Sequence, residues 1–167
     1  VENSSQTQVM RELAVKTFRP YITGGRLLEL GCSDGFMTNE LSKLADHLDV
    51  IDGSEHFLSL ARKRNIKNVD YYFELFENFK SNTRYDHIVA SYVLEHVRDP
   101  ISILNNCSSL LAPGGKIYIV VPNSRALSRQ LGRHMGLISE LTELTENDHN
   151  HGHRRVYDRR SLNMDIT

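Results

Sequence analysis

Residues 27–36 have the sequence LLELGCSDGF, and the rest of the chain is predicted to fold around them. A short apolar run that ends in glycine is typical of a buried strand. A helical pattern of apolar residues then runs from Phe36 to about Ala45, with Ser33 or Asp34 as the expected N-cap. The stretch therefore predicts a strand, a turn and a helix in succession. In an open α/β sheet such a turn lies at the carboxyl end of its strand, where ligands bind. Glycines at Gly31 and Gly35 let the backbone turn sharply and approach a ligand closely.

The charges beside this turn indicate which ligand it prefers. The spacing of Gly31 and Gly35 departs from the G-x-G-x-x-G pattern that places a pyrophosphate on a helix N-terminus. Carboxylates at Glu29 and Asp34 would repel a pyrophosphate and favour a cationic ligand. S-adenosylmethionine carries a sulfonium and an ammonium group and has no phosphate. The turn therefore suits this ligand better than NAD.

The sequence resembles the class I S-adenosylmethionine-dependent methyltransferases. The segment LELGCSDG looks like their first motif, and further matches follow in order up to Asn123. They are an acidic strand end at Asp52, the strand Tyr85–Ser91 with Leu94-Glu95-His96 after it, and Leu111-x-Pro113-Gly114-Gly115 before an apolar strand expected at Lys116–Val121. The resemblance implies a doubly wound, Rossmann-like α/β fold with a mostly parallel sheet in the order 3-2-1-4-5. The closing hairpin of that fold is expected to be missing, because the chain ends at Thr167.

The resemblance also implies roles for individual residues. Glu29 is expected to bind the ammonium group of S-adenosylmethionine, and Asp52 the ribose, a role that its position about 20 residues after the first glycine also favours. Leu75 and Phe76 are expected to flank the adenine. Ser91 and Tyr92 are expected at the methyl-donor end. The complete predicted cofactor site is Glu29, Gly31, Cys32, Ser33, Gly35, Asp52, Gly53, Ser54, Leu75, Phe76, Ser91 and Tyr92.

One segment departs from the family pattern. The family often has an acidic residue and a small residue after the third strand, whereas this chain has Glu74-Leu75-Phe76-Glu77. Backbone contact with the adenine at Leu75 or Phe76 is compatible with this change. The alternative interpretation is that both side chains belong to the core.

His96 is the candidate catalytic residue, because it follows the fourth strand and an imidazole can take a proton near neutral pH. The alternative is a histidine that only holds its own loop. Some relatives bind a divalent metal through a Glu-x-x-Glu-His segment, but Tyr92 replaces the first of those acids here. The prediction is therefore a site without metal, and metal binding by Glu95, His96 and a later histidine is the alternative.

The segment from His149 to Arg160 is rich in histidine and arginine, and Gly152–Tyr157 resembles a GHxRxY segment of small-molecule methyltransferases. It is interpreted as a solvated loop or as a lid in which Arg154 or Arg155 grips an anionic substrate. RNA binding is a weaker interpretation, because the sequence has no aromatic platform or wider basic field.

Length and composition limit the class of protein. A chain of 167 residues with 40% hydrophobic and 25% charged residues suits one globular domain. The formal net charge of −1 favours neither nucleic acid nor a membrane surface, and no apolar stretch approaches the length of a membrane span. The start has no signal-peptide pattern, and Cys32 and Cys107 have no metal or redox spacing. A cytoplasmic protein is therefore predicted.

Three regions are expected along the chain. Residues 1–22 form an amphipathic helix that covers the site, with Val9, Met10, Leu13 and Phe18 on its apolar face. Residues 23–123 form the cofactor-binding core. Residues 124–167 form a lid or substrate segment with helices near Ala126–Leu131 and Leu137–Leu144, followed by the start of a truncated C-terminal part.

The predicted function is transfer of a methyl group from S-adenosylmethionine to an oxygen or nitrogen atom of a small-molecule acceptor, such as a sugar or another biosynthetic metabolite. The alternatives are methylation of RNA or protein, and a module that binds the cofactor without turnover.

Overall fold

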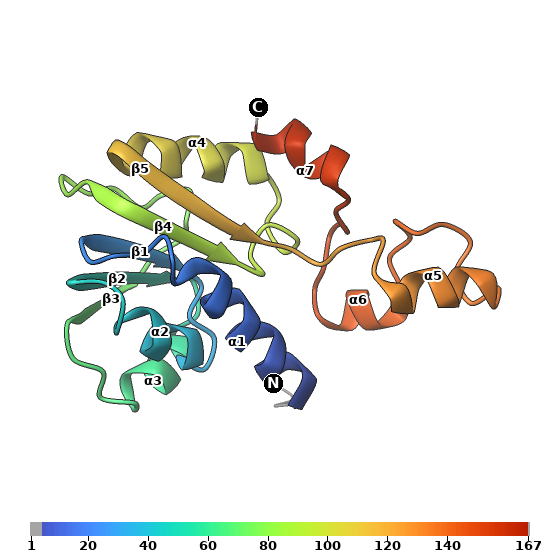
Figure 1. Cartoon of the computed structure of the whole chain (residues 1–167), viewed down its shortest axis with the longest axis horizontal. Coiled ribbons are helices and arrows are strands. Elements are labelled where there is room, and N and C mark those ends of the chain that lie inside the picture. Colours follow the sequence, from blue (N-terminus) through green and yellow to red (C-terminus); the bar gives the residue numbers. More distant parts are fainter. Residues whose placement is uncertain (1–4, 167) are drawn as a thin grey trace.

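A parallel sheet of five strands forms the centre of the chain in the computed structural model, which describes residues 5–166 (Figure 1). The strands are β1 (Arg26–Leu30), β2 (His47–Asp52), β3 (Val69–Phe73), β4 (Tyr85–Ser91) and β5 (Leu111–Val120). Their order is β3-β2-β1-β4-β5, and every neighbouring pair is parallel. The predicted fold class and strand order are confirmed.

Helices cover both faces of the sheet (Figure 1). The helices α1 (Ser5–Phe18), α2 (Phe36–Leu41) and α3 (Glu55–Arg62) lie on one face, and α4 (Pro100–Leu110) and α7 (Arg159–Ile166) lie on the other. Two more, α5 (Leu127–His134) and α6 (Glu146–Asn150), project beyond the carboxyl ends of the strands. Local sequence explains two helix starts, because Ser54 and Asp99 cap α3 and α4 with their side-chain oxygens.

The core consists of two layers separated by the sheet. Alternation along each strand sends successive side chains to opposite faces. Leu27 of β1 therefore packs with α1–α3, whereas Leu28 and Leu30 pack with α4. Leu27, Leu28 and Leu48 are fully buried. Each such side chain stabilises the fold by about 1.5–3 kcal/mol, which anchors the strand ends that carry the site.

Some predicted details are wrong. In α1 the residues Ala14, Val15 and Phe18 are buried, whereas Val9, Met10 and Leu13 are about half exposed, because the first half of the helix extends past the sheet. α2 ends at Leu41 instead of continuing to Ala45. Residues 137–144, predicted as a helix, form turns and bends, and a capping box at Thr145 starts α6 after them. The fifth strand begins at Leu111 rather than at Lys116, with an irregular register at its start.

Candidate functional site

The glycine turn after β1 has the strained geometry that its sequence predicts. Gly31 and Gly35 both have φ of 76°, a left-handed conformation that favours glycine, and Ser33 has φ of 49°. A Cβ on Gly31 would lie 3.4 Å from Val93 Cγ2, so this glycine faces the loop after β4. A Cβ on Gly35 would lie 2.8 Å from the Cα of Ala61 in α3. Gly35 is therefore required for helix packing, whatever the turn binds.

Glu29 lies at the base of this turn and is 1% exposed. Within residues 5–166, neither of its carboxylate oxygens has a hydrogen-bond partner. Burial raises the pKa of Glu29 from 4.5 to about 8, the Thr38 hydroxyl opposes this rise, and the nearby Asp52 carboxylate adds to it. A buried carboxylate without donors is costly, and a cationic group of a ligand would relieve that cost.

Asp52 connects the turns after β1 and β2. Its Oδ2 accepts a hydrogen bond from the Cys32 backbone N–H at 2.9 Å, and its Oδ1 accepts one from the Ser54 N–H at 2.8 Å. The Cys32 thiol also lies 3.5 Å from Oδ2. Because each carboxylate oxygen has two lone pairs, Oδ1, which has one donor, can accept a further bond from a ligand. The structure thus brings Cys32, Asp52, Gly53 and Ser54 together at one edge of the sheet.

The loop after β3 contributes an apolar wall. Leu75 packs against Gly53, where an added Cβ would lie 3.1 Å from Leu75 Cδ2, and yet Leu75 remains 51% exposed. Phe76 is partly buried in the core layer below α4, and its Cζ would lie 3.8 Å from a Cβ on Gly31. An exposed apolar side chain beside a buried aromatic ring suits a flat heterocycle. The core interpretation therefore applies to Phe76 and not to Leu75.

Ser91 and Tyr92 end β4 at the same edge. The Ser91 hydroxyl is buried and has no hydrogen-bond partner within the described part of the chain. Tyr92 has φ of 57°, and its N–H donates to the Val120 carbonyl at 2.8 Å. A left-handed backbone at a bulky residue costs about 1–3 kcal/mol and is concentrated at functional sites. This strain could not be predicted from the residue types.

A cluster of Glu95, His96 and His153 follows Tyr92. Glu95 is fully buried, and its carboxylate oxygens make no well-formed hydrogen bond with another residue among residues 5–166. Burial raises the pKa of Glu95 to about 7 and lowers the pKa of His96 below its ordinary 6.5. The His96 and His153 rings meet edge to face at 4.9 Å. One ligand atom from each of the three residues lies within 4.8 Å of the others, so the cluster could hold a divalent ion.

The segment after β5 holds His153 in place. Asp148 Oδ1 lies 3.0 Å from His153 Nδ1, and Arg129 of α5 donates to Asp148 Oδ2 at 3.0 Å. Hydrogen bonds from Thr145 and Arg129 keep the pKa of Asp148 far below its ordinary value, although burial opposes them. A carboxylate on the second ring nitrogen fixes the tautomer of a histidine, which orients the ring towards His96.

The prediction that Arg154 or Arg155 grips a substrate receives no support from their contacts. Arg154 Nε donates to the His96 carbonyl at 2.9 Å. Arg155 donates to the carbonyls of Leu94, Val97 and Arg98. Both arginines therefore anchor the loop that carries His96.

A groove of about 670 Å³ contains three other arginines. It is lined by Asn123, Arg125, Asp158, Arg159, Arg160, Asn163 and Met164. Its lining residues come from the segment just after β5 and from α7 with the residue before it.

Several site contacts were not predicted. Arg11 of α1 donates to Asp34 Oδ1 at 3.1 Å and to the Ser33 hydroxyl at 3.3 Å, and Arg64 donates to Asp34 Oδ2 at 3.1 Å. Asp34 is therefore neutralised by two arginines, and its charge does not favour a cationic ligand in the way that the sequence predicted. Asp34 Oδ1 also accepts from the Phe36 N–H, while Gly35 occupies the N-cap position predicted for Ser33 or Asp34. The sequence carries no local signal for the long-range contact of Arg11.

Comparison with known proteins places this geometry in a family. The sequence profile described as "Methyltransferase domain" matches residues 5–165. The chain belongs to this methyltransferase family. Within the family it is 30% identical over 107 residues to a ubiquinone biosynthesis O-methyltransferase of Xanthomonas euvesicatoria pv. vesicatoria, a match that covers 61% of this chain and 45% of that protein. The methyltransferase chain thus spans less than half the length of this curated relative.

Solved structures of methyltransferases share the fold. The N-methyltransferase NodS from Bradyrhizobium japonicum, solved with S-adenosyl-L-homocysteine, has a TM-score of 0.72 at 17% identity, over 99% of this chain and 75% of NodS. The plantazolicin methyltransferase BpumL, also solved with that product, has a TM-score of 0.67 at 29% identity, over 77% of this chain and 53% of BpumL. None of the helices in residues 5–166 is long and apolar enough to cross a membrane.

Proposed function

We propose that this chain binds S-adenosylmethionine and transfers its methyl group to a small-molecule acceptor. The observation that carries the proposal is the buried carboxylate of Glu29, which lies at the glycine turn beside the Thr38 hydroxyl and makes no well-formed hydrogen bond within the described residues. The ammonium group of the cofactor would supply the missing donors. Family membership and the product bound to BpumL support the same cofactor.

Different residues around the turn would contact different parts of the cofactor. Asp52 would hold the ribose hydroxyls with its free lone pairs, supported by Cys32, Gly53 and Ser54. Leu75 would cover the adenine, and Ser91 and Tyr92 would border the reacting end. The backbone of Gly31, Ser33 and Gly35 would shape the pocket of the amino-acid moiety. Alignment of the reacting atoms in this way can contribute roughly 7–11 kcal/mol.

When bound, S-adenosylmethionine supplies an electrophilic methyl group on a sulfonium, and attack by the acceptor breaks the carbon–sulfur bond and releases S-adenosylhomocysteine. His96 would take the proton that an acceptor hydroxyl or amine loses. Burial lowers the pKa of His96, so the ring is neutral and able to accept a proton at neutral pH. The backbone contacts from Arg154 and Arg155 would fix the loop that presents this base.

Glu95 supports a second interpretation of the same cluster, in which Glu95, His96 and His153 hold a divalent ion. An ion would satisfy the buried Glu95 carboxylate and would orient an acceptor oxygen. Turnover after dialysis against a chelator decides between the two. A free base predicts unchanged turnover, whereas a loss that Mn²⁺ or Mg²⁺ restores would establish the metal.

The acceptor side of the site lies between α1 and the segment after β5. We assign residues 1–22 to a covering helix, of which the first four lie outside the described residues, residues 23–123 to the cofactor core, and residues 124–167 to the acceptor lid. An anionic group of the acceptor would meet Arg125, Arg159 and Arg160 in the groove. The buried free thiols of Cys32 and Cys107 support a reducing, cytoplasmic setting.

Two experiments test the proposed function. Calorimetric titration of the purified chain should show binding of S-adenosylhomocysteine and none of NAD⁺, and the opposite result would refute the proposal. Incubation with labelled S-adenosylmethionine and metabolite extracts should then reveal the acceptor by its gain of one methyl group. Labelling of RNA or protein alone would instead establish a macromolecular acceptor.

A further inference from the structure

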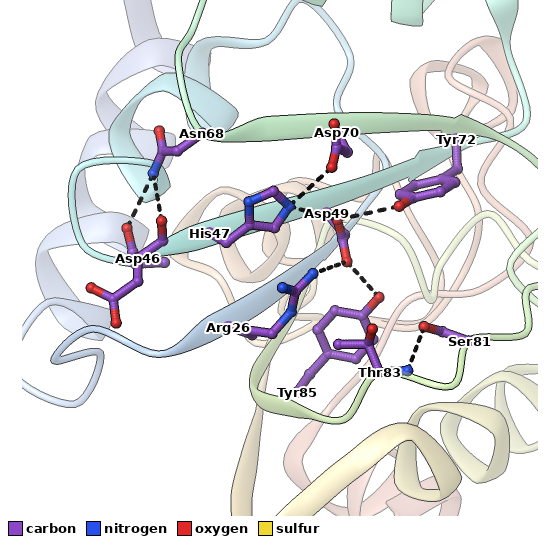
Figure 2. Close-up of polar contacts among 11 residues, drawn as sticks. Arg26, Asp46, His47, Asp49, Asn68, Asp70, Tyr72, Ser81, Thr83 and Tyr85 are labelled. Carbon is purple, nitrogen blue, oxygen red and sulfur yellow. Dashed lines mark hydrogen bonds and ion pairs between the residues drawn. The ribbon is translucent and has the colours of Figure 1, made fainter.

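A second polar cluster lies near the amino ends of the strands, at the other end of the sheet from the glycine turn. His47 is the first residue of β2, Asp49 follows two residues later, and Asp70 lies near the start of β3. Figure 2 shows the His47 ring with one nitrogen, Nε2, directed towards the carboxylates of both Asp49 and Asp70. We propose that His47, Asp49 and Asp70 bind a divalent transition-metal ion of the zinc class. This inference does not depend on the proposed methyl transfer.

The distances within the cluster match a metal site. His47 Nε2 lies 3.1 Å from Asp49 Oδ1 and 3.1 Å from Asp70 Oδ2. All three ligand atoms lie within 4.8 Å of one another. Donor atoms held about 2.0–2.1 Å from a tetrahedral zinc ion are roughly 3.3 Å apart. The three side chains therefore need little movement to surround one ion.

Hydrogen bonding alone explains this arrangement poorly. A single imidazole nitrogen carries at most one proton, so it cannot make two well-directed hydrogen bonds to two carboxylates. Asp49 and Asp70 are also direct partners in the parallel register of β2 and β3. Like charges in such positions repel each other and destabilise a sheet. A divalent cation between them would turn that repulsion into a link between the two strands.

The buried member of the cluster is already oriented. Asp49 is 2% exposed, and its Oδ2 accepts a hydrogen bond from the Tyr85 hydroxyl at 2.7 Å and one from Arg26 at 3.3 Å (Figure 2). Its Oδ1 is directed towards His47, with the Tyr72 hydroxyl 3.5 Å away. Partners of this kind fix metal ligands in productive orientations. Tyr85 and Arg26 are therefore positioning residues for the proposed site.

The donor set selects the class of metal. One imidazole and two carboxylates suit Zn²⁺, Mn²⁺ or Co²⁺, whereas Mg²⁺ and Ca²⁺ prefer oxygen ligands alone. The charges also permit a cation, because Asp49 and Asp70 outweigh Arg26, whose guanidinium contacts the carboxylate oxygen that faces away from His47. Asp70 is 65% exposed, so an ion can enter from solvent and retain water ligands.

The experiment measures zinc binding by calorimetry. The Glu95, His96 and His153 cluster could also take zinc, so all variants carry His96→Gln and His153→Gln. This background protein should bind one zinc ion per chain. Asp70→Asn and His47→Gln should each weaken binding at least about tenfold, because each removes one of three ligands. Co²⁺ should give visible absorption bands in the background protein that disappear in Asp70→Asn.

Matched exposed substitutions provide the controls. Glu77→Gln removes an exposed carboxylate and His134→Gln an exposed imidazole elsewhere on the surface, and both should leave zinc affinity unchanged. Tyr85→Phe keeps the packing but removes the hydroxyl that orients Asp49, and should weaken zinc binding without abolishing it. The proposal is overturned if the background protein binds no zinc, or if Asp70→Asn binds it as tightly as the background protein. Displacement of zinc by equimolar Mg²⁺ would also overturn the assignment of metal class.

Discussion

Among single residues, Glu29 should couple cofactor binding to proton release. Its pKa of about 8 in the free protein means that the carboxyl holds a proton at neutral pH, whereas a cationic ligand requires the ionised form. Affinity for S-adenosylhomocysteine should therefore fall as the pH decreases from 8 to 6, by up to about tenfold per unit. Calorimetry at pH 7 in buffers of different ionisation enthalpy should detect one released proton.

The variant Glu29→Gln is the control for this coupling. It should bind the ligand weakly and with little dependence on pH over the same range. The same pH dependence in Glu29→Gln and in the unaltered protein would assign the proton to another group and remove Glu29 from the cofactor site.

Asp52 should be indispensable for cofactor binding, because it holds two turns together and is the proposed ligand of the ribose. Asp52→Ala removes the acceptor of the Cys32 and Ser54 N–H groups and the proposed ribose contact. Hydrogen bonds to charged groups contribute about 1.5–3 kcal/mol each, so affinity for S-adenosylhomocysteine should fall more than tenfold. Titration in metal-free buffer measures this, with Asp70→Asn as the control. Equal affinities in the two variants would defeat the assignment.

Substitution of His96 should slow catalysis without weakening cofactor binding. His96→Ala should lower kcat by about 10²–10⁴-fold, because a positioned base contributes that much, while affinity for S-adenosylhomocysteine stays nearly unchanged. Initial rates with the identified acceptor give kcat, and a parallel titration gives the affinity for S-adenosylhomocysteine. Unaltered turnover would reduce His96 to a residue that supports its loop.

Among the elements, the stability of α6 and its flanking turns should depend on Asp148. This carboxylate binds Thr145 and Arg129 and lies beside His153, and its pKa is lowered by those hydrogen bonds. The stabilisation is present above the ordinary Asp pKa of 3.8 and is lost as the pH falls through the lowered value. Asp148→Asn should speed amide hydrogen exchange across residues 137–153 at neutral pH, with cofactor affinity unchanged.

An exposed acid of the same helix gives the comparison. Glu146→Gln alters the first turn of α6 and should leave the exchange rates as they are. If Asp148→Asn exchanges no faster than Glu146→Gln, the network around Asp148 does not hold this segment together.

Local patterns predicted the elements that carry the proposed cofactor site. The strand, turn and helix around Gly31 depend on neighbouring residues, and Asp52 lies at a fixed distance along the chain, so both could be placed. The helix predicted at 137–144 is absent, because its apolar spacing is helical but only Ile138 of this segment is buried. The prediction of a buried apolar face in the first half of α1 is wrong for the same reason, since burial of a periodic face requires a neighbouring element.

Long-range contacts explain the rest of what the sequence did not reveal. Arg11 reaches Asp34 across 23 positions, and Arg155 reaches the Leu94 carbonyl across 61. No local pattern encodes such pairs, so Asp34 looked like a free charge and Arg155 like a substrate ligand. The strain at Tyr92 likewise depends on the pairing of its N–H with β5.

The molecule as a whole places two candidate sites at opposite edges of one sheet. Glu29 and Asp52 lie where β1 and β2 end, and Asp49 lies three residues before Asp52. This separation corresponds to roughly 10 Å along the strand, and the alternation of side chains directs Asp49 and Asp52 to opposite faces. Sites at such distances without shared partners usually contribute to stability independently. The cofactor site and the proposed metal site should therefore act separately.

Thermal unfolding of the His96→Gln and His153→Gln variant tests this independence. S-adenosylhomocysteine at about 100 times its Kd should stabilise the protein by about 2.7 kcal/mol, and zinc at the same excess by a similar amount. For a chain of this size each ligand should raise Tm by roughly 5–10 °C. Together they should give the sum to within about 0.5 kcal/mol. Asp70→Asn should abolish only the zinc increment and Asp52→Ala only the cofactor increment, whereas a combined effect well above or below the sum would show that β2 couples its two ends.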